Sequence, residues 1–278
     1  MGAAHTPAAS SRSPRSAVTI PDRSSMYDVA NFSLADMVRV TGVLRRLGLA
    51  AASMEETAVR IVRHLQEQLL DTDEQRPACP LVQCFTTQPF AALPEADREA
   101  AKSRIVEGTL SPCTLCWTLL ASAGDLPEWN DRLHARQAPV AAITDEEFPV
   151  SFPLFAPLLA QFGLGTAAPQ QKDLHILLDP QERTFGVFHV PDATASPYLH
   201  STQLQLANRY GIRSVVGFGG LLPSLNAFVL ALFTRVPLSK PQIEMFRTIA
   251  LAAKLAFLPF DGGPVFSSHR SLSCEERV

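Results

Sequence analysis

The sequence lacks a long hydrophobic run and has no large excess of either charge. Its longest uninterrupted apolar stretch is residues 227–233, far short of the ~18–20 residues that cross a bilayer. This excludes a membrane-spanning helix. Basic side chains number 24 and acidic ones 27, for a formal net charge of −3. The chain has no basic surplus of the kind that favours nucleic-acid binding, and it has no acidic block of the kind that forms a solvated tail.

The sequence also lacks an export signal and a disulfide framework. Residues 1–25 are rich in Ser, Ala, Pro and Arg and contain no apolar segment of the kind that a signal peptide needs. The chain has 278 residues but only five cysteines, an odd number that does not suit a secreted disulfide scaffold. We therefore expect a cytoplasmic protein with reduced thiols.

Hydrophobic residues make up 46% of the chain, enough to bury a sizeable core. At ~150 residues per domain, this length favours one domain with appendages. Residues 1–30 hold few large apolar side chains, which predicts a disordered leader. The sequence then predicts a single domain over residues 31–260 and a flexible tail over 261–278.

The elements expected within that domain are of both types. Ser33 with Asp36, and Ser53 with Glu56, are N-cap signatures that each begin an amphipathic helix. A third, at Ser239, begins a last helix that ends near residue 258. Runs rich in strand formers are predicted as strands over residues 79–86, 114–121, 185–190, 212–218 and 227–236. The order predicts an α+β fold, an antiparallel sheet with two N-terminal helices and one C-terminal helix packed on one side.

The sequence YGIRSVVGF at residues 210–218, a turn, the apolar run from Phe228 and then the Ser239 helix resemble the end of a GAF domain. The resemblance extends over about residues 33–260 and is strongest to GAF-like sensory domains found upstream of bacterial histidine kinases and cyclases. It implies a non-enzymatic sensory domain with a small-molecule pocket between one sheet face and the connecting loops.

The chain departs from better-known GAF subfamilies. It has no Asn-Lys-Phe-Asp-Glu set, so the resemblance does not support cyclic-nucleotide binding, and no Cys-His pair that would hold a linear tetrapyrrole. The cofactor is therefore unknown. No kinase output follows the last helix, so we expect a cytoplasmic protein that either signals through a protein partner, such as a histidine kinase or a cyclase, or has lost its output.

Seven residues are candidates for binding the small molecule. They are Trp129, Asn130, Arg132, His189, Tyr198, Arg213 and Gly217. Trp129 and Arg132 together suggest an aromatic and cationic lid over an anionic ligand.

Each candidate also has a structural interpretation. Trp129 can pin its loop to the sheet while Arg132 pairs with Asp131, and His189 can be a hydrogen-bonded core residue. Gly217 can permit a bulge instead of a close approach to a ligand.

Two further hypotheses remain open. Cys113 and Cys116 form a CxxC, and with Cys79 and Cys84 they leave room for a thiol-redox enzyme on the same fold. No catalytic constellation or metal-binding spacing supports an enzyme, and the spacing of the cysteines along the predicted strands favours core thiols over a redox pair. The last helix is apolar over more than half of its circumference, so a dimeric adaptor without a ligand is the other alternative.

Overall fold

We describe the chain from a computed structural model, in which the described residues are 26–104, 109–133, 140–144, 148–165, 175–176 and 185–267. Within these ranges a seven-stranded sheet forms the centre, with the strand order β6-β5-β4-β10-β9-β8-β7 and every neighbouring pair antiparallel. Its strands are β4 (Leu81–Pro89), β5 (Leu115–Gly124), β6 (Ala141–Ala142), β7 (His175–Ile176), β8 (Phe185–Val190), β9 (Ser214–Leu221) and β10 (Ala227–Thr234).

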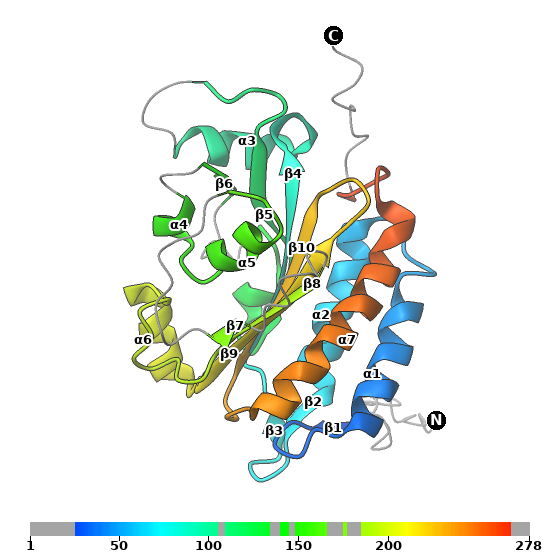
Figure 1. Ribbon diagram of the computed structural model, residues 1–278, viewed down its shortest axis with the longest axis vertical. Coiled ribbons are helices and arrows are strands. Elements are labelled where there is room, and N and C mark those ends of the chain that lie inside the picture. The colour runs from blue at the N-terminus through cyan, green and yellow to red at the C-terminus, as the bar shows by residue number, and fades with distance from the viewer. Residues whose placement is uncertain are drawn as a thin grey trace, which may run out of the picture.

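Two different layers cover the sheet (Figure 1). One face, here called the helix face, packs against α2 (Met54–Gln68) and α7 (Lys240–Phe257), and α1 (Leu34–Leu47) packs against these two helices on the same side. The opposite face, here called the loop face, is covered by the 3-10 turn η3 (Pro127–Asn130) and by three short helices. These are α4 (Phe148–Ser151), α5 (Ala156–Gln161) and α6 (Ser201–Tyr210).

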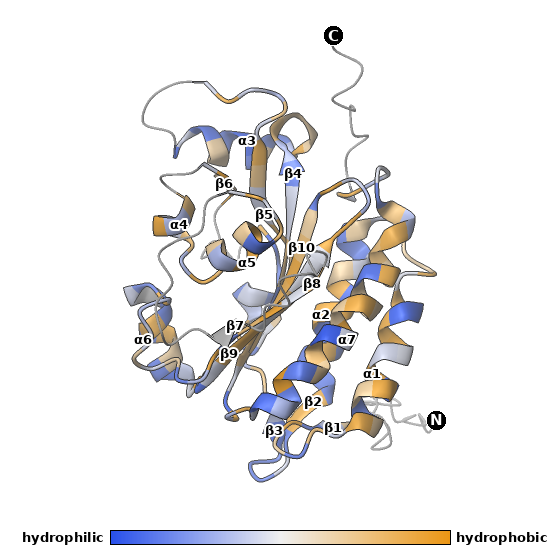
Figure 2. Ribbon diagram, in the orientation of Figure 1, coloured by the Kyte–Doolittle hydropathy of each residue, from blue (hydrophilic) through white to orange (hydrophobic). Residues whose placement is uncertain are grey.

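The central strand β10 is apolar on both faces because it is buried on both. Phe228 and Leu230 pack into the core of the helix face, whereas Val229 and Phe233 pack into that of the loop face. Strand β10 is accordingly largely orange in Figure 2, whereas β4 is pale and the long helices carry both hydrophobic and hydrophilic residues. This two-sided burial explains why an antiparallel strand lacks the usual alternation.

The predicted helix starts are confirmed. The Ser33 hydroxyl accepts a hydrogen bond from the Asp36 amide, and Ser53 accepts one from Glu56 in the same way. At the start of α7 the Gln242 side chain accepts from the Ser239 amide at 2.7 Å. The α+β class and the three helices on one side of an antiparallel sheet are as the sequence predicts.

The ordered chain begins earlier than residue 31. Strand β1 (Tyr27–Asp28) pairs in parallel with β2 (Leu69–Asp71), which in turn pairs with β3 (Arg76–Pro77). Tyr27 and Val29 are 2% and 3% exposed. Two large apolar side chains in a short segment suffice to bury it, so residues 26–30 belong to the domain and not to the leader.

The ordered chain also continues beyond residue 260. After the 3-10 turn η4 (Leu258–Phe260), the carbonyls of Pro264 and Val265 accept hydrogen bonds from the amides of Met54 and Glu55. Phe266 is buried, at 3% exposure. The first amides of α2 have no partners within the helix, and this segment supplies them. The predicted flexible tail is thus wrong for residues 261–267.

Two further elements complete the described fold. A 3-10 turn, η2 (Phe90–Ala92), leads into helix α3 (Glu95–Lys102), which lies beside β6. Residues 148–161 form two short helices, α4 and α5, and not one continuous helix. No helix among the described residues is both long and apolar enough to cross a membrane.

Candidate functional site

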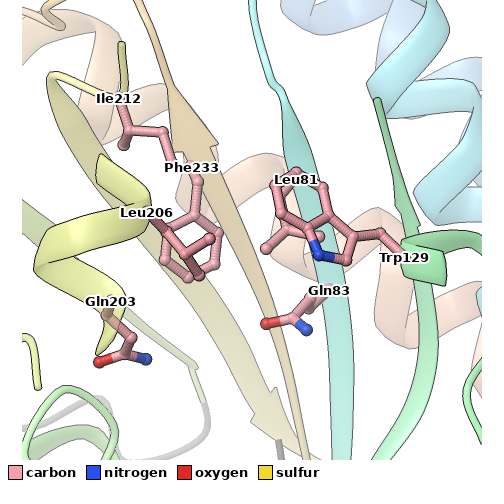
Figure 3. A pocket seen from close by; sticks show the side chains of 7 residues that line it. All are labelled: Leu81, Gln83, Trp129, Gln203, Leu206, Ile212 and Phe233. Carbon is pink, nitrogen blue, oxygen red and sulfur yellow. The ribbon is translucent and has the colours of Figure 1, made fainter. Parts of the chain in front are cut away.

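A pocket opens on the loop face between α6, η3 and the central strands (Figure 3). Its lining residues are Leu81, Gln83, Trp129, Gln203, Leu206, Ile212 and Phe233. The space between them is ≈ 390 Å³ when its open mouth is included, of which ≈ 20 Å³ admits the centre of a water molecule. In this conformation the pocket therefore accommodates a water molecule or a compact group.

Trp129 forms one wall because its loop is tightly tied to the end of β5. The Asn130 side chain accepts a hydrogen bond from the amide of Gly124 at 3.1 Å and donates one to the Gly124 carbonyl at 2.9 Å. A Cβ atom at Gly124 would lie 2.8 Å from the Trp129 ring and 2.7 Å from the Pro80 carbonyl oxygen. Only glycine lets the indole lie across the strand at this point.

The opposite wall comes from the YGI part of the 210–218 motif. Gly211 ends α6 in the left-handed conformation, with φ +68, which turns the chain back toward the sheet. This turn places Ile212 in the pocket and Tyr210 edge-on to Trp129, with their ring centroids 4.9 Å apart. The motif thus positions two side chains of the site.

The floor of the pocket is polar. Gln83 lies in the middle of β4 and Ser122 is directly opposite it on β5, so both side chains point to the loop face. They are 7% and 4% exposed. Neither side chain has a hydrogen-bond partner within the described residues, and the Ser122 hydroxyl oxygen is fully buried. Buried polar groups are normally satisfied, so the Ser122 hydroxyl is an exception, whereas the Gln83 amide faces the open space of the pocket.

The mouth of the pocket is bounded by the start of α6. The Gln203 side chain lines the pocket and accepts a hydrogen bond from the His200 amide at 3.0 Å through its oxygen. His200 is in turn 2.7 Å from the Ser151 carbonyl oxygen through its Nε2 atom. The Gln203 amide nitrogen extends toward the gap, as does the Gln83 amide (Figure 3).

None of the residues lining this pocket is charged. Arg235, which contacts Tyr210 behind the pocket, is engaged by the carbonyls of Tyr210 and Pro77 and by the carboxylate of Asp125. In the described part of the chain, no cluster of three or more His, Cys, Asp or Glu side chains could hold a metal ion. The pocket is built for hydrogen bonding without charge.

Of the seven predicted residues, the structure brings only Trp129 into this pocket. Asn130 is exposed and its side chain fixes the η3 turn. Tyr198 is buried on the loop face, in the same core as Trp129. Arg213 is exposed, and only its backbone is engaged, with Ala193 and Thr234.

Arg132 does not form a lid. Its guanidinium pairs with Asp97 at 2.7 Å and lies 3.5 Å from Glu55, and it stacks over the Phe266 ring. These partners belong to α3, to the start of α2 and to the C-terminal segment. The pairing expected with Asp131 is replaced by a link between three parts of the fold, so no cationic lid covers this pocket.

His189 and Gly217 also lie apart from the pocket. His189 is opposite Val216 in the β8–β9 ladder, and Val216 packs into the core of the helix face, so His189 points away from the pocket. Gly217 faces the loop side, but the ring of Phe188 occupies the space above it. A glycine is needed at position 217 because of the Phe188 ring, and not because a ligand approaches there.

Beside the pocket, aromatic rings fill the loop face. Phe85 stacks on Trp117 with a centroid distance of 4.9 Å and meets Phe155 at the same distance. Phe188 lies edge-on to Phe155 at 5.9 Å. These rings occupy the middle of the sheet face, which confines open space to the Gln83 end.

Three of the cysteines in the described part of the chain are free and do not pair with one another. Cys79, Cys84 and Cys116 are buried free thiols, and burial raises the pKa of all three, to about 12 for Cys79 and Cys116. Cys116 is therefore not joined to Cys113, the other half of the CxxC. Cys113 is exposed and disulfide-bonded, whereas the sequence predicts reduced thiols throughout.

Sequence reasoning missed most of the pocket. Two sequence features could have indicated it. Gln83 is an amide within an apolar strand run, and Leu204, Ala207 and Tyr210 have helical spacing before Gly211, where α6 ends. Leu81, Ile212 and Phe233 are ordinary core residues by pattern. Only the three-dimensional structure shows that these residues line the pocket.

No family model and no curated protein matches the chain. Among solved structures, it is similar to the GAF domain of a phosphoenolpyruvate-protein phosphotransferase (ptsP) from Coxiella burnetii, with 14% identity, a TM-score of 0.41 and coverage of 82% of this chain and 97% of that one. It is also similar to the phycoerythrobilin-bound GAF domain of a cyanobacterial phytochrome, with 10% identity, a TM-score of 0.37 and coverage of 80% and 91%.

A third similar structure is the N-acylhomoserine lactone dependent LuxR family transcription factor CepR2 from Burkholderia cenocepacia, with 14% identity, a TM-score of 0.38 and coverage of 83% and 99%. Similarity of this degree supports no conclusion about what the present chain binds. In the chain itself, the strand that follows Tyr210 pairs with β10, which leads into the closing helix α7, and α1 and α2 join α7 on one side; this is the order that the resemblance of residues 210–218 to the end of a GAF domain leads one to expect.

Proposed function

We propose that the chain is a non-enzymatic sensory domain that binds a small molecule in the pocket between β4, β10, η3 and α6. The observation that carries the proposal is the Gln83 side chain, an amide 7% exposed that faces an apolar pocket and has no partner within the described residues. Ligand sites are commonly apolar clefts with a few converging polar groups, which is the composition found here.

A route from the pocket to the helix face supports a regulatory role. Trp129 contacts Tyr210, whose carbonyl accepts a hydrogen bond from Arg235 at 3.0 Å. Arg235 pairs with Asp125, and Asp125 accepts from Gln66 of α2 at 3.4 Å. A ligand that moves the indole would thereby shift the contacts that hold α2. Double-mutant cycles on pairs of these residues would measure whether the pocket and α2 are energetically coupled.

The surface through which the signal leaves is the outer side of α1 and α7. Leu34 and Val38 on α1 are 67% and 59% exposed, and Leu251 and Leu255 on α7 are 45% and 41% exposed. Large apolar side chains spaced three to four residues apart on a helix are suited to a protein partner. A histidine kinase, a cyclase or a second copy of the chain could occupy this surface.

A ligand-free adaptor is the second candidate, and the aromatic packing of Phe85, Trp117, Phe155 and Phe188 favours it. In that case the loop face is simply a core, and the chain acts through dimerisation. The thiol-redox alternative receives no support, because the three free thiols are buried with raised pKa values.

A thermal-shift screen against a panel of metabolites separates these candidates. We expect one selective stabiliser, since a ligand at 100 times its dissociation constant adds roughly 2.7 kcal/mol. Leu206→Phe, which fills the pocket, should abolish the shift, whereas Gln205→Phe, at an exposed neighbouring position of α6, should keep it. A flat panel together with a stable dimer by light scattering would favour the adaptor.

A further inference from the structure

We propose that the ligand of this pocket is an uncharged molecule that presents a hydrogen-bond donor and an acceptor side by side, as a lactam or a cis amide does. The proposal rests on the proposed function and names its ligand class. It follows from three features of the pocket, which are the amide at its floor, the apolar walls and the lack of charge in its lining.

The amide at the floor determines the hydrogen-bonding pattern. The end of the Gln83 side chain carries an N–H donor and a carbonyl acceptor in one plane, whichever way the amide is turned. The group that satisfies both at once is another planar donor–acceptor edge, the same pairing by which glutamine reads an adenine edge in DNA. Ser122, directly opposite on β5, is not part of the pocket lining, so Gln83 supplies the hydrogen-bonding edge of the floor alone.

The mouth adds donors on the other side. The Gln203 oxygen already accepts from the His200 amide, so its NH₂ group remains to donate. The Trp129 indole N–H has no acceptor within the described residues, and its nitrogen lies on the side of the ring nearer Gln83 (Figure 3). A ligand carbonyl between them would receive the hydrogen bonds that these two donors otherwise give to water.

The walls set the shape and exclude charge. Leu81, Leu206, Ile212 and Phe233 enclose the polar floor with apolar side chains. A carboxylate or an ammonium group bound here would be partly desolvated and would meet no charged side chain in the lining of the pocket. The pocket therefore discriminates against ions and favours a small ring with one polar edge. This differs from the anionic ligand that the sequence suggests.

The chain's two tryptophans provide the test. In protein labelled with 5-fluorotryptophan, Trp129 reports on the pocket and Trp117, buried in the aromatic cluster, serves as an internal reference. The probes are 2-pyrrolidinone, which has the donor–acceptor edge, and γ-butyrolactone, which is the same ring with the N–H replaced by oxygen. The pyroglutamate anion is the charged member of the series.

We expect 2-pyrrolidinone to shift the Trp129 fluorine resonance saturably and to leave that of Trp117 in place. The lactone and the anion should bind at least about tenfold more weakly, the loss expected for one unmatched hydrogen bond or buried charge. Gln83→Leu should remove the preference for the lactam, and Gln83→Glu should remove it at nearly constant size. Gln88→Leu, at the other end of β4, is the matched control and should bind as the wild type does.

Other outcomes would overturn the proposal. Equal binding of lactam and lactone, or lactam binding unchanged in Gln83→Leu, would refute the donor–acceptor edge while leaving small-molecule binding intact. Gln83→Leu with higher thermal stability, and no probe that moves Trp129, would show that the floor holds only water. If the metabolite screen were flat as well, the proposed function would fail with it.

Discussion

The ring of Phe188 lies directly over the α-carbon of Gly217 on the neighbouring strand. A Cβ atom at Gly217 would come within 2.0 Å of the Cε1 and Cζ atoms of that ring, and Phe188 is fully buried. Phe188 in turn meets Phe155 edge-on. This contact closes the middle of the loop face and leaves the Gln83 end as the place where a small molecule can enter.

Gly217→Ala should therefore destabilise the domain. The phenyl ring has no free space to move into, so we expect a loss of about 1–3 kcal/mol, the usual range for overpacking a core. Denaturant unfolding measures the change. Gly42→Ala is the control, because nothing lies within 4 Å of a Cβ atom there and the residue is in helix α1; it should gain about 0.5–1 kcal/mol. Unchanged stability in Gly217→Ala would contradict the contact.

Arg132→Ala should unfold the domain more readily without altering the pocket. It would leave Asp97, which is 6% exposed, as a buried carboxylate without its ion pair. The cost expected for breaking such a pair is about 3–5 kcal/mol. The double variant Arg132→Met with Asp97→Asn removes both charges and should recover part of the loss. A double variant no more stable than Arg132→Ala would argue against this pair.

Stability should fall on the acid side partly through His64. Burial lowers the pKa of His64 from its usual 6.5, and the ring packs edge-on to Tyr27, which Arg39 overlies. Because the folded state then binds the proton less well than the unfolded state, the contribution is complete above about pH 6.5 and is lost as the pH falls through the folded pKa.

The slope from this one group reaches at most about 1.4 kcal/mol per pH unit. Unfolding free energies of the wild type and His64→Gln, measured between about pH 7.5 and 5, give the comparison. The variant should show a shallower decline over that window. Parallel pH profiles for the two proteins would mean that His64 is not the group responsible.

The buried thiols should resist modification. With iodoacetamide near pH 8, Cys79, Cys84 and Cys116 of the native protein should remain unlabelled, because burial both shields them and raises their pKa. All three should react in denaturant, and mass spectrometry of the digested protein locates the label. Rapid labelling of any of them in the native state would reopen the thiol-enzyme hypothesis.

Patterns within a single element predicted much of this fold. The N-caps at Ser33, Ser53 and Ser239 and the strand at Phe185–Val190 depend on neighbouring residues, and the sequence located them correctly. The buried positions of Tyr27 and Phe266 depend on contacts with distant segments. Composition alone therefore assigned them wrongly to a leader and a tail.

The site was predictable only in part for the same reason. Trp129 was identified because a bulky aromatic side chain in a loop must pack against a neighbouring surface or a ligand. Arg132 and His189 carry equally suggestive chemistry, but the face of the sheet on which each lies follows from strand register and from the path of the loop. Gln83 is a candidate because strand pairing and the path of the η3 loop place its amide in the pocket, and neither follows from the sequence around it.

Native mass spectrometry of the protein purified from its own host tests most directly whether the pocket holds a small molecule. We predict a species heavier than the 30.2 kDa chain by the mass of one small uncharged compound. This added mass should be absent from Leu206→Phe and present in Gln205→Phe. A bare mass in both the wild type and Leu206→Phe, at twice the chain weight, would contradict ligand binding and identify the chain as a dimeric adaptor.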